Sequence, residues 1–202
     1  MTKGAGERPV RAERRDALEN RQRILETAQH LFDEHGVEAV SMNQITQTAQ
    51  LGPGTLYRHY RNKSELCWDL IKDHIGQLFE DIAGYLAQHA QDAAPQRLRG
   101  TVHLLIQFRE KKLQLLAGVE RDPSRQVWPS RTPSPLYQDL HDIFVQLFRE
   151  MAGNPSDADS VFKADVLLTV LQSDSYVFHR DVRGYSADQL LEQICATFFP
   201  EV

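Results

Sequence analysis

The sequence predicts an all-α protein of about nine helices. Apolar residues recur at three- and four-residue intervals over most of the chain, which places them on one face of successive helices. Ser41–Gln44, Asn62–Glu65 and Ser186–Gln189 have the pattern of capping boxes, in which a polar side chain caps a new helix and a later Gln or Glu reaches back. Glycine and proline separate the periodic segments, as at Gly36 and Pro95.

Composition limits the class of protein. A length of 202 residues with 41% hydrophobic residues suits one domain or two small ones, with enough apolar surface to bury a core. The mean hydropathy is −0.47 and no apolar run approaches the length of a membrane span, so we expect a soluble protein with no membrane partner. The N-terminus does not resemble a secretory signal. Two cysteines far apart exclude a disulfide scaffold and favour a cytoplasmic location.

Charge is unevenly divided along the chain. Residues 1–63 hold 10 Lys/Arg and 8 Asp/Glu, a net of +2, whereas residues 64–202 hold 13 and 20, a net of −7. A basic end allows an acidic protein to meet an acidic polymer. Residues 1–15 are basic and lack an apolar period, which predicts a flexible tail. This tail is either a solvated terminus or an arm that lies against DNA.

Residues 16–63 are predicted to form a domain of three helices. The first ends at Gly36, which tolerates a left-handed backbone. The second follows the Ser41 cap, and the third begins at Pro53, where a missing amide has no helical partner to lose. Two short helices joined by a tight turn form either a helix-turn-helix or an ordinary α-hairpin, and spacing does not separate the two.

The outer face of the third helix favours the helix-turn-helix. It carries Thr55, Tyr57, Arg58 and His59, and no carboxylate occurs between residues 52 and 64. A face that supplies donors and aromatic rings without negative charge suits a DNA groove. Arg58 can pair with guanine through two hydrogen bonds.

The residues that carry the strongest resemblance are ILETA at 24–28, LFDEHG at 31–36, SMNQI at 41–45, GTLYRHY at 54–60 and KSEL at 63–66. In their order and spacing, they resemble the tetracycline-repressor (TetR) family of bacterial regulators, over about residues 20–70. The resemblance implies an all-helical homodimer. Residues 16–63 would form its DNA-binding domain, and residues 64–202 a larger ligand-binding and dimerisation domain.

The resemblance also implies specific DNA contacts. Residues matching the family's usual contacts are Ser41, Met42, Asn43, Thr55, Tyr57, Arg58 and His59, and Lys63 matches a phosphate contact at the start of the fourth helix. Two positions depart from the family pattern. Gln50 stands where glycine is common, so a left-handed backbone there costs about 1–2 kcal/mol. Pro53 stands where a polar or basic residue is common.

Residues 64–202 are predicted to be helical with one long loop. A helix runs from residue 63 to about 88. Another spans 98–108 and is followed by a short one over 113–119. The proline-rich segment 121–135, with Trp128, is predicted to be a loop that anchors the core or gates a cavity. Further helices are expected over 136–151, over 161–182 and after the Ser186 cap.

The two terminal helices are apolar enough either to close a core or to pair with a second copy. The resemblance favours pairing, which would place two recognition helices about one DNA turn apart on a palindromic operator. The candidate dimer residues are Phe162, Val166, Val170, Leu171, Leu190, Leu191, Ile194 and Phe198.

A small-molecule cavity is expected between the helices of residues 64–202. Its candidate residues combine aromatic and polar side chains: Phe79, Tyr85, His103, Phe108, Arg109, Glu120, Trp128, Tyr137 and Phe144. They indicate a medium-sized, partly apolar ligand. The eight histidines lack metal-ligand spacing, and neither a phosphate-binding loop nor a nucleophile elbow occurs, so we expect no cofactor, no metal and no catalysis.

These observations predict a dimeric transcriptional regulator. The favoured form is a repressor that binds a palindromic operator through residues 41–63 and leaves it when a small molecule occupies residues 64–202. Two alternatives remain at this point: a helical small-molecule carrier without a DNA function, and a protein–protein adaptor.

Overall fold

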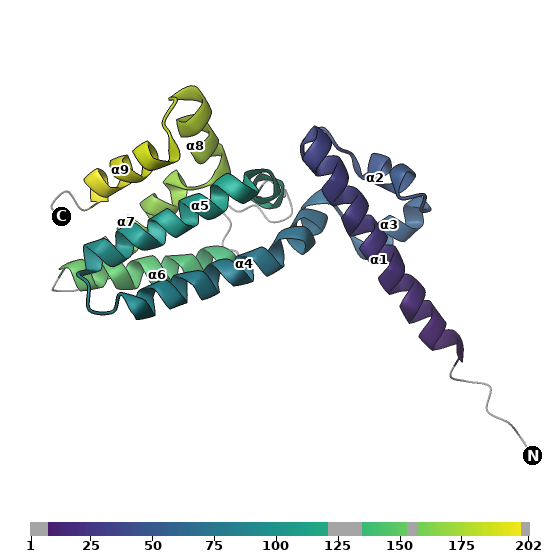
Figure 1. The fold of residues 1–202 in the computed structure, drawn as a ribbon, viewed down its shortest axis with the longest axis horizontal. Helices are drawn as coiled ribbons and strands as arrows, with labels where there is room; N and C mark the ends of the chain where they lie inside the picture. Colours follow the sequence, from purple (N-terminus) through teal and green to yellow (C-terminus); the bar gives the residue numbers. More distant parts are fainter. Residues whose placement is uncertain (1–7, 121–134, 153–156, 199–202) are drawn as a thin grey trace, which may run out of the picture. The chain divides into compact units, whose positions relative to one another are not determined.

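The computed structural model describes residues 8–120, 135–152 and 157–198. Within these ranges the chain is helical and contains no strand, so the predicted all-α class is confirmed (Figure 1). It divides into two compact units, Met1–Leu70 and Ile71–Val202. None of the described helices is long and apolar enough to cross a membrane. The proline-rich segment with Trp128 lies outside the described residues, apart from its last position.

The first unit is built on α1 (Arg8–His35), α2 (Met42–Thr48), α3 (Pro53–His59) and the start of α4 (Lys63–Gln88). Its core combines side chains from all four helices: Ile24, Ala28, Phe32, Ile45, Leu56 and Leu66. The helical spacing of these residues therefore produces one shared apolar interior.

The predicted flexible tail is wrong over residues 8–15, because α1 begins at Arg8. Proline is tolerated in the first turn of a helix, so Pro9 does not prevent this early start. Arg15 forms an ion pair of 3.2 Å with Glu19, four residues later on the same helix. Charged residues with good helix propensity extend the helix here without an apolar stripe.

The left-handed backbone predicted after the first helix and in the turn after the second helix is confirmed. Gly36 has a φ of 81°, and Gln50 has a φ of 53°. Among the described residues, Gln50 is the non-glycine residue with a positive φ. The left-handed backbone expected at this departure from the family pattern is therefore present.

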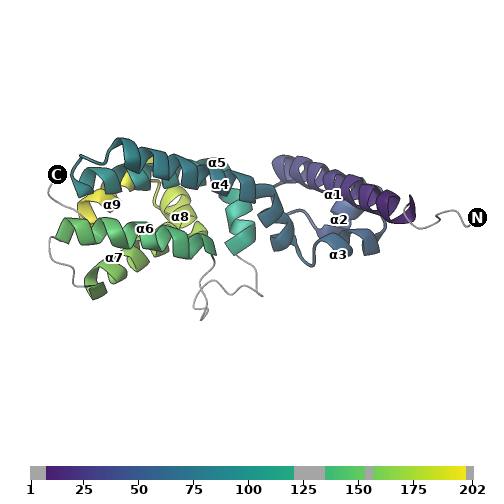
Figure 2. The same cartoon turned by 90° about the horizontal axis from the view of Figure 1, so that it is seen from below.

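The second unit contains the rest of α4, α5 (Ala94–Glu120), α6 (Pro135–Ala152), α7 (Asp157–Val170), α8 (Ser173–Val177), the π-helical segment η2 (Phe178–Val182) and α9 (Ala187–Phe198). Helix α6 packs against α5 and α7 (Figure 2). The largest fully buried side chains of this unit are Phe144, Tyr176, Ile71, Ile82, Leu98, Ile106, Leu116 and Leu167.

Two predicted helix boundaries in this unit are wrong. Helix α5 is continuous across residues 109–112, because Arg-Glu-Lys-Lys favours a helix and contains no breaker. The segment 161–182 is not one helix: Gln172 is extended (ψ 152°) and starts α8, which continues as η2. This change of direction allows Tyr176 and Arg180 to reach the same residue of α5.

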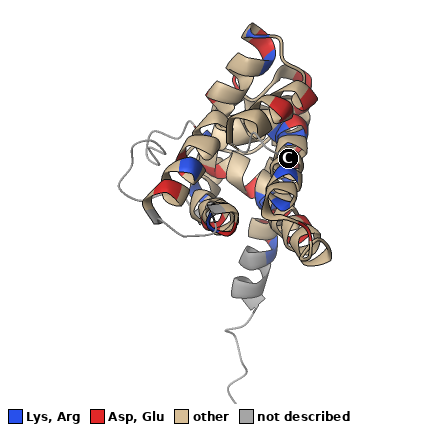
Figure 3. Cartoon of the chain, turned by 90° about the vertical axis from the view of Figure 1, so that its left-hand side faces the viewer, with Lys and Arg blue, Asp and Glu red and all other residues tan. Residues whose placement is uncertain are grey.

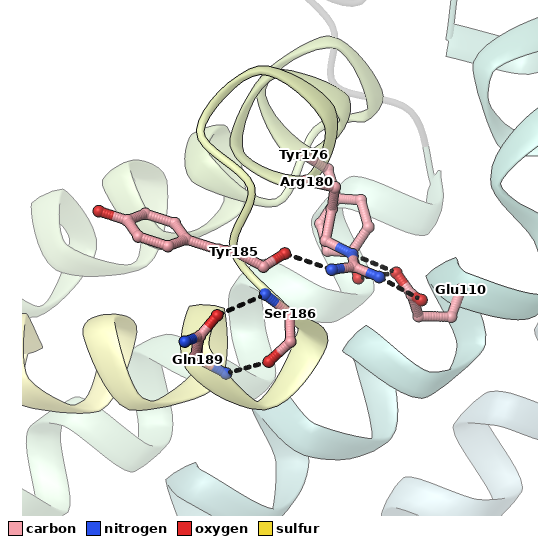
Figure 4. A network of polar contacts seen from close by, with 6 residues as sticks. All are labelled: Glu110, Tyr176, Arg180, Tyr185, Ser186 and Gln189. Carbon is pink, nitrogen blue, oxygen red and sulfur yellow. Dashed lines mark hydrogen bonds and ion pairs between the residues drawn. The ribbon is translucent and has the colours of Figure 1, made fainter.

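Glu110 of α5 is that residue (Figure 4). Its Oε1 accepts hydrogen bonds from the Tyr176 hydroxyl (2.5 Å) and from Arg180 Nε (2.9 Å), and its Oε2 accepts from Arg180 Nη2 (3.0 Å). Arg180 Nη1 also donates to the Tyr185 carbonyl. Charge-assisted bonds of this kind join α5 to η2 and to the segment that leads into α9.

The predicted capping box is complete where α9 begins, and the Ser41 half of the predicted box is present where α2 begins. The Ser186 amide donates to Gln189 Oε1 (2.8 Å), and the Gln189 amide donates to Ser186 Oγ (3.1 Å; Figure 4). Ser41 Oγ accepts from the Gln44 amide (3.2 Å). These bonds satisfy amides that have no partner inside the helix.

Candidate nucleic-acid interface and ligand-binding unit

Helix α2 presents its first residues to solvent because its other face is anchored. Ile45 and Thr46 are buried, and Thr46 Oγ1 donates to the Met42 carbonyl over 2.7 Å. The opposite face therefore points outward, with Ser41 and Asn43 exposed and Met42 half-buried. These three residues match the predicted backbone contacts to DNA.

The turn between α2 and α3 is closed by backbone hydrogen bonds. The Leu51 amide donates to the Thr46 carbonyl (3.0 Å), and the Gln50 amide donates to the Gln47 carbonyl (3.1 Å). The left-handed Gln50 makes this short connection possible. Gly52 then caps α3 without a side chain, and Pro53 occupies the first helical position as predicted.

Helix α3 has one buried face and one exposed face. Leu56 is fully buried and Tyr60 is almost so, which fixes the helix on the core. On the other side, Tyr57 is 48% exposed and Arg58 is exposed, whereas Thr55 and His59 are half-buried. Four of the predicted DNA-contact residues therefore lie along one short helix, and the two most exposed are the arginine and the tyrosine.

Arg58 is held without a carboxylate partner among the described residues. Its Nε donates to the Gly54 carbonyl over 3.1 Å, one turn earlier in α3. That bond leaves the terminal guanidinium donors available and orients the side chain along the helix. Because residues 52–64 contain no Asp or Glu, this face carries donors without local negative charge.

Asp69 joins three elements of the first unit, and the sequence reasoning missed it. Its carboxylate accepts hydrogen bonds from Arg21 of α1 (2.6 Å to each oxygen) and from the Tyr60 hydroxyl at the end of α3. Burial raises the pKa of Tyr60, and the hydrogen bond to Asp69 raises it further. This cluster explains why the first unit extends to Leu70, past the expected boundary at residue 63.

The structure gives Lys63 a different environment from the expected phosphate contact. Its Nζ donates to three carbonyl oxygens of the connection between α1 and α2: Val37 (2.6 Å), Val40 (3.0 Å) and Glu38 (3.3 Å). An ammonium has three hydrogens to donate, so these acceptors use all of them. In this arrangement the Lys63 ammonium positions the start of α2.

The first unit thus holds a donor-bearing, carboxylate-free helix on a fixed three-helix base. Comparison with known proteins identifies the family of the chain. Residues 24–67 match the model of bacterial regulatory proteins of the tetR family. An HTH-type transcriptional regulator of Staphylococcus aureus (strain bovine RF122 / ET3-1) is 32% identical over 189 residues, which are 94% of this chain and 97% of that protein.

The chain belongs to the TetR family. A second relative, the HTH-type transcriptional regulator of Staphylococcus aureus strain USA300, is 32% identical over 196 residues, 94% of this chain and 97% of that protein. These relatives are named as HTH-type transcriptional regulators, and the matched segment, residues 24–67, contains the α2–α3 pair of this TetR-family chain.

Two solved structures share the fold. Thermus thermophilus FadR in complex with lauroyl-CoA has a TM-score of 0.64 at 19% identity, over 88% of this chain and 92% of that one. AibR in complex with isovaleryl coenzyme A and operator DNA has a TM-score of 0.57 at 21% identity, over 91% of this chain and 100% of that one. Likeness at these identities supports the all-helical architecture.

Several predicted ligand residues of this TetR-family chain have partners within the second unit. Phe144 is fully buried in the core. The Tyr85 hydroxyl donates to the Gln96 carbonyl (3.1 Å), and the Tyr137 hydroxyl donates to Asp165 (2.5 Å). His103 Nε2 lies 2.8 Å from Gln107 Nε2, and Phe79 is half-buried against the core. Each of these side chains therefore contacts other residues of the second unit.

Arg109 and Glu120, also predicted at the ligand cavity, form an ion pair in which Arg109 is buried and Glu120 is half-buried. Arg109 Nη2 donates to Glu120 Oε1 (3.0 Å), and Arg109 Nη1 donates to Ser173 Oγ (3.3 Å). The Ser173 amide donates to Glu120 Oε2 over 2.7 Å. The pair therefore joins the end of α5 to the start of α8, while Arg109 Nε is buried without a hydrogen-bond partner.

A groove between α4 and α5 contains one predicted ligand residue, Phe108. The groove has a volume of about 210 Å³. Its lining residues are His74, Gln77, Leu78, Asp81, Leu104, Gln107, Phe108, Lys111 and Lys112. The other eight were missed by the sequence reasoning, although their three- and four-residue spacing along both helices is a signal that could have found them.

Four of the eight predicted dimer residues are unavailable to a partner. Leu171, Leu190, Leu191 and Ile194 are buried in the core of the single chain, so they close that core. Phe198 is half-buried against Phe148, with ring centroids 5.9 Å apart. On α7, however, Phe162 is 66% exposed, and Val166 and Val170 are half-buried.

The two thiols are buried, and Cys195 Sγ also accepts a hydrogen bond from Arg99 Nη1 (3.3 Å). Cys67 is fully buried, and burial raises its pKa to about 12. Cys195 is also buried, and burial raises its pKa as well. A thiol must ionise to act as a nucleophile, so neither cysteine is activated in this structure.

Proposed function

We propose that this TetR-family regulator is a repressor that binds a palindromic operator as a homodimer and is released by a small molecule. It would act in the cytoplasm and without catalysis. The observation that carries the proposal is the outer face of α3, where Tyr57 and Arg58 are exposed and no carboxylate occurs from residue 52 to residue 64. That face suits the major groove of DNA, whose backbone is a polyanion.

The DNA contacts would divide into two kinds. Arg58 and Tyr57, which are exposed, would meet base edges, since an Arg can bind guanine through two hydrogen bonds. Ser41 and Asn43, exposed at the start of α2, would donate to phosphates, as helix N-termini commonly do. Thr55 and His59 would add contacts at the flanks of the same surface.

The exposed apolar residues of α7 support a homodimer. Phe162 is 66% exposed, and the half-buried Val166 and Val170 follow at helical spacing on the same helix. A large apolar side chain in this position is favourable when a second copy covers it. A two-fold dimer would present two α3 helices to half-sites about 34–36 Å apart.

The ligand-binding role rests on the second unit. FadR and AibR, which share the fold, are described with lauroyl-CoA and with isovaleryl coenzyme A respectively, and AibR also with operator DNA. These complexes support an effector site in the second unit of this chain. By linkage, an effector that weakens operator binding must itself bind less tightly to the operator-bound dimer, with a typical coupling of about 1–3 kcal/mol.

Selection from a random double-stranded DNA pool tests the proposal. We expect an inverted repeat to be enriched, and its binding to the purified chain to weaken steeply with salt. Arg58→Ala should weaken binding by about 1–3 kcal/mol and relax the preference at one base pair of each half-site. Arg183→Ala, which removes an exposed arginine from the second unit, is the matched control and should leave binding unchanged.

The same selection separates the alternatives. A carrier or an adaptor would show no enrichment and no salt-dependent DNA binding. A monomeric protein, or indifference to every duplex at low ionic strength, would contradict the proposal.

A further inference from the structure

The groove between α4 and α5 of the second unit combines an apolar floor with charged ends. Leu78 is buried, and Leu104 and Phe108 are half-buried, so the floor is apolar. The rim carries His74, Gln77, Asp81, Gln107, Lys111 and Lys112. Sites for small organic molecules likewise combine apolar surface, which covers the body of the ligand, with polar groups that fix its orientation.

The two lysines of the groove differ from other cations of the unit. Five cations form ion pairs with carboxylates: Arg97 with Glu150, Arg99 with Glu192, Arg109 with Glu120, Lys163 with Asp159 and Arg180 with Glu110. Basic and acidic residues are accordingly interspersed over these helices (Figure 3). Lys111 and Lys112 have no ion pair with any carboxylate of the described residues, although the unit is acidic overall.

The charges are separated along the groove. Helices α4 and α5 run in opposite directions (Figure 1), which places His74 toward the Lys111–Lys112 end and Asp81 toward the Leu104 end. His74 and Asp81 are seven residues apart, or roughly 10 Å along a helix. The Asp81 carboxylate accepts a hydrogen bond from Gln77 (2.9 Å). One end of the groove therefore favours an anion and the other end disfavours one.

We infer that this groove binds a small organic monoanion, with its charged group at Lys111 and Lys112 and a compact apolar body over Leu78, Leu104 and Phe108. The volume of about 210 Å³ lies below the roughly 300–1,000 Å³ of sites for drug-sized ligands, which limits the ligand to a smaller molecule. A second negative charge would meet Asp81, so dianions are disfavoured. On the proposed function, this monoanion is the effector class, because the groove is formed by α4, which also contributes residues to the first unit.

The test uses the full chain and monoanions of the stated class. Phenylacetate and cyclohexanecarboxylate are compared with their neutral amides, with phenylmalonate as a dianion and with inorganic phosphate as an anion without an apolar body. Binding is followed by NMR of the leucine methyl groups. We expect both carboxylates to shift the Leu78 and Leu104 signals, and the amides, the dianion and phosphate to bind at least tenfold more weakly.

Two variants locate the charge. Lys111→Gln combined with Lys112→Gln should weaken phenylacetate binding at least tenfold without changing the thermal midpoint of the free protein. Lys163→Gln, a lysine paired with Asp159 on α7, is the matched control and should leave binding unchanged. Equal binding of carboxylate and amide, or equal binding by the double variant and the wild type, would overturn the monoanion site.

Three further outcomes are decisive. Chemical-shift changes confined to core methyl groups such as those of Leu190 would place the ligand elsewhere and overturn the proposed binding site in the groove. No shift with either carboxylate at about 10 mM, which would saturate a site of millimolar affinity, would overturn it as well. Binding at the groove without any change in affinity for the selected operator would overturn the effector role alone. Operator selection with the ligand-free protein tests the proposed function separately, so the two failures are distinguishable.

Discussion

Replacing Lys63 by methionine distinguishes a positioning role from a phosphate contact. The substitution keeps the aliphatic stem and removes the ammonium that donates to the carbonyls of Val37, Glu38 and Val40. A hydrogen bond to a charged group contributes about 1.5–3 kcal/mol when buried. Lys63 is only half-buried and water can replace part of its contacts, so we expect a total loss of about 1.5–3 kcal/mol in the unfolding free energy of the first unit.

Urea unfolding followed by tryptophan fluorescence measures this loss. Trp68 belongs to the first unit, and a Trp128→Phe background removes the other tryptophan of the chain. Lys163→Met, which removes only an exposed ion pair, should change stability by less than about 1 kcal/mol. The salt dependence of operator binding supplies the second measurement. A phosphate contact would lower its slope by about 0.9 per lost charge, whereas a positioning residue leaves the slope unchanged. Unchanged stability together with a lower slope would refute our reasoning.

Three further predictions concern the second unit. Gly100→Ala improves helix propensity, but its Cβ would overlap the ring of Tyr85, so we expect a loss of about 1–2 kcal/mol in urea unfolding. In a Tyr85→Ala background the same change should become stabilising by about 0.5–1 kcal/mol, and a loss in both backgrounds would contradict the overlap. The hydrogen bond from Arg180 holds the pKa of Glu110 below its ordinary value of 4.5, so the folded state binds fewer protons than the unfolded state. The resulting contribution to the free energy of unfolding is present above about pH 4.5 and is lost as pH falls through the folded-state pKa. Glu110→Gln should therefore flatten the pH dependence of stability over about pH 3–6. An unaltered slope would exclude Glu110 as the source of that dependence. Phe162→Glu should give a monomer in sedimentation velocity and abolish binding to the palindrome, whereas a persistent dimer would show that α7 is not the interface.

Features that depend on neighbours in the chain could be predicted from the residues alone. Helical spacing, the Ser41 and Ser186 caps, Pro53 at the start of α3 and the left-handed Gly36 all follow from interactions within a few residues. The exposed face of α3 was predictable for the same reason, because Leu56 and Tyr60 at helical spacing leave Tyr57 and Arg58 on the other side. The family motif could be recognised because it lies in one continuous segment, residues 24–67.

Features that depend on distant residues could not be predicted in this way. Lys63 forms hydrogen bonds to carbonyls more than twenty residues earlier, and Glu110 accepts hydrogen bonds from Arg180, seventy residues later. Leu190 and Ile194 have the same apolar pattern whether they close the core of one chain or pair with another, and burial in the second unit decides this. The groove likewise exists because α4 and α5 bring two separate stripes of side chains together. Periodicity and capping are local, whereas the partner of a charged or apolar side chain is set by the packing of helices that are far apart in sequence.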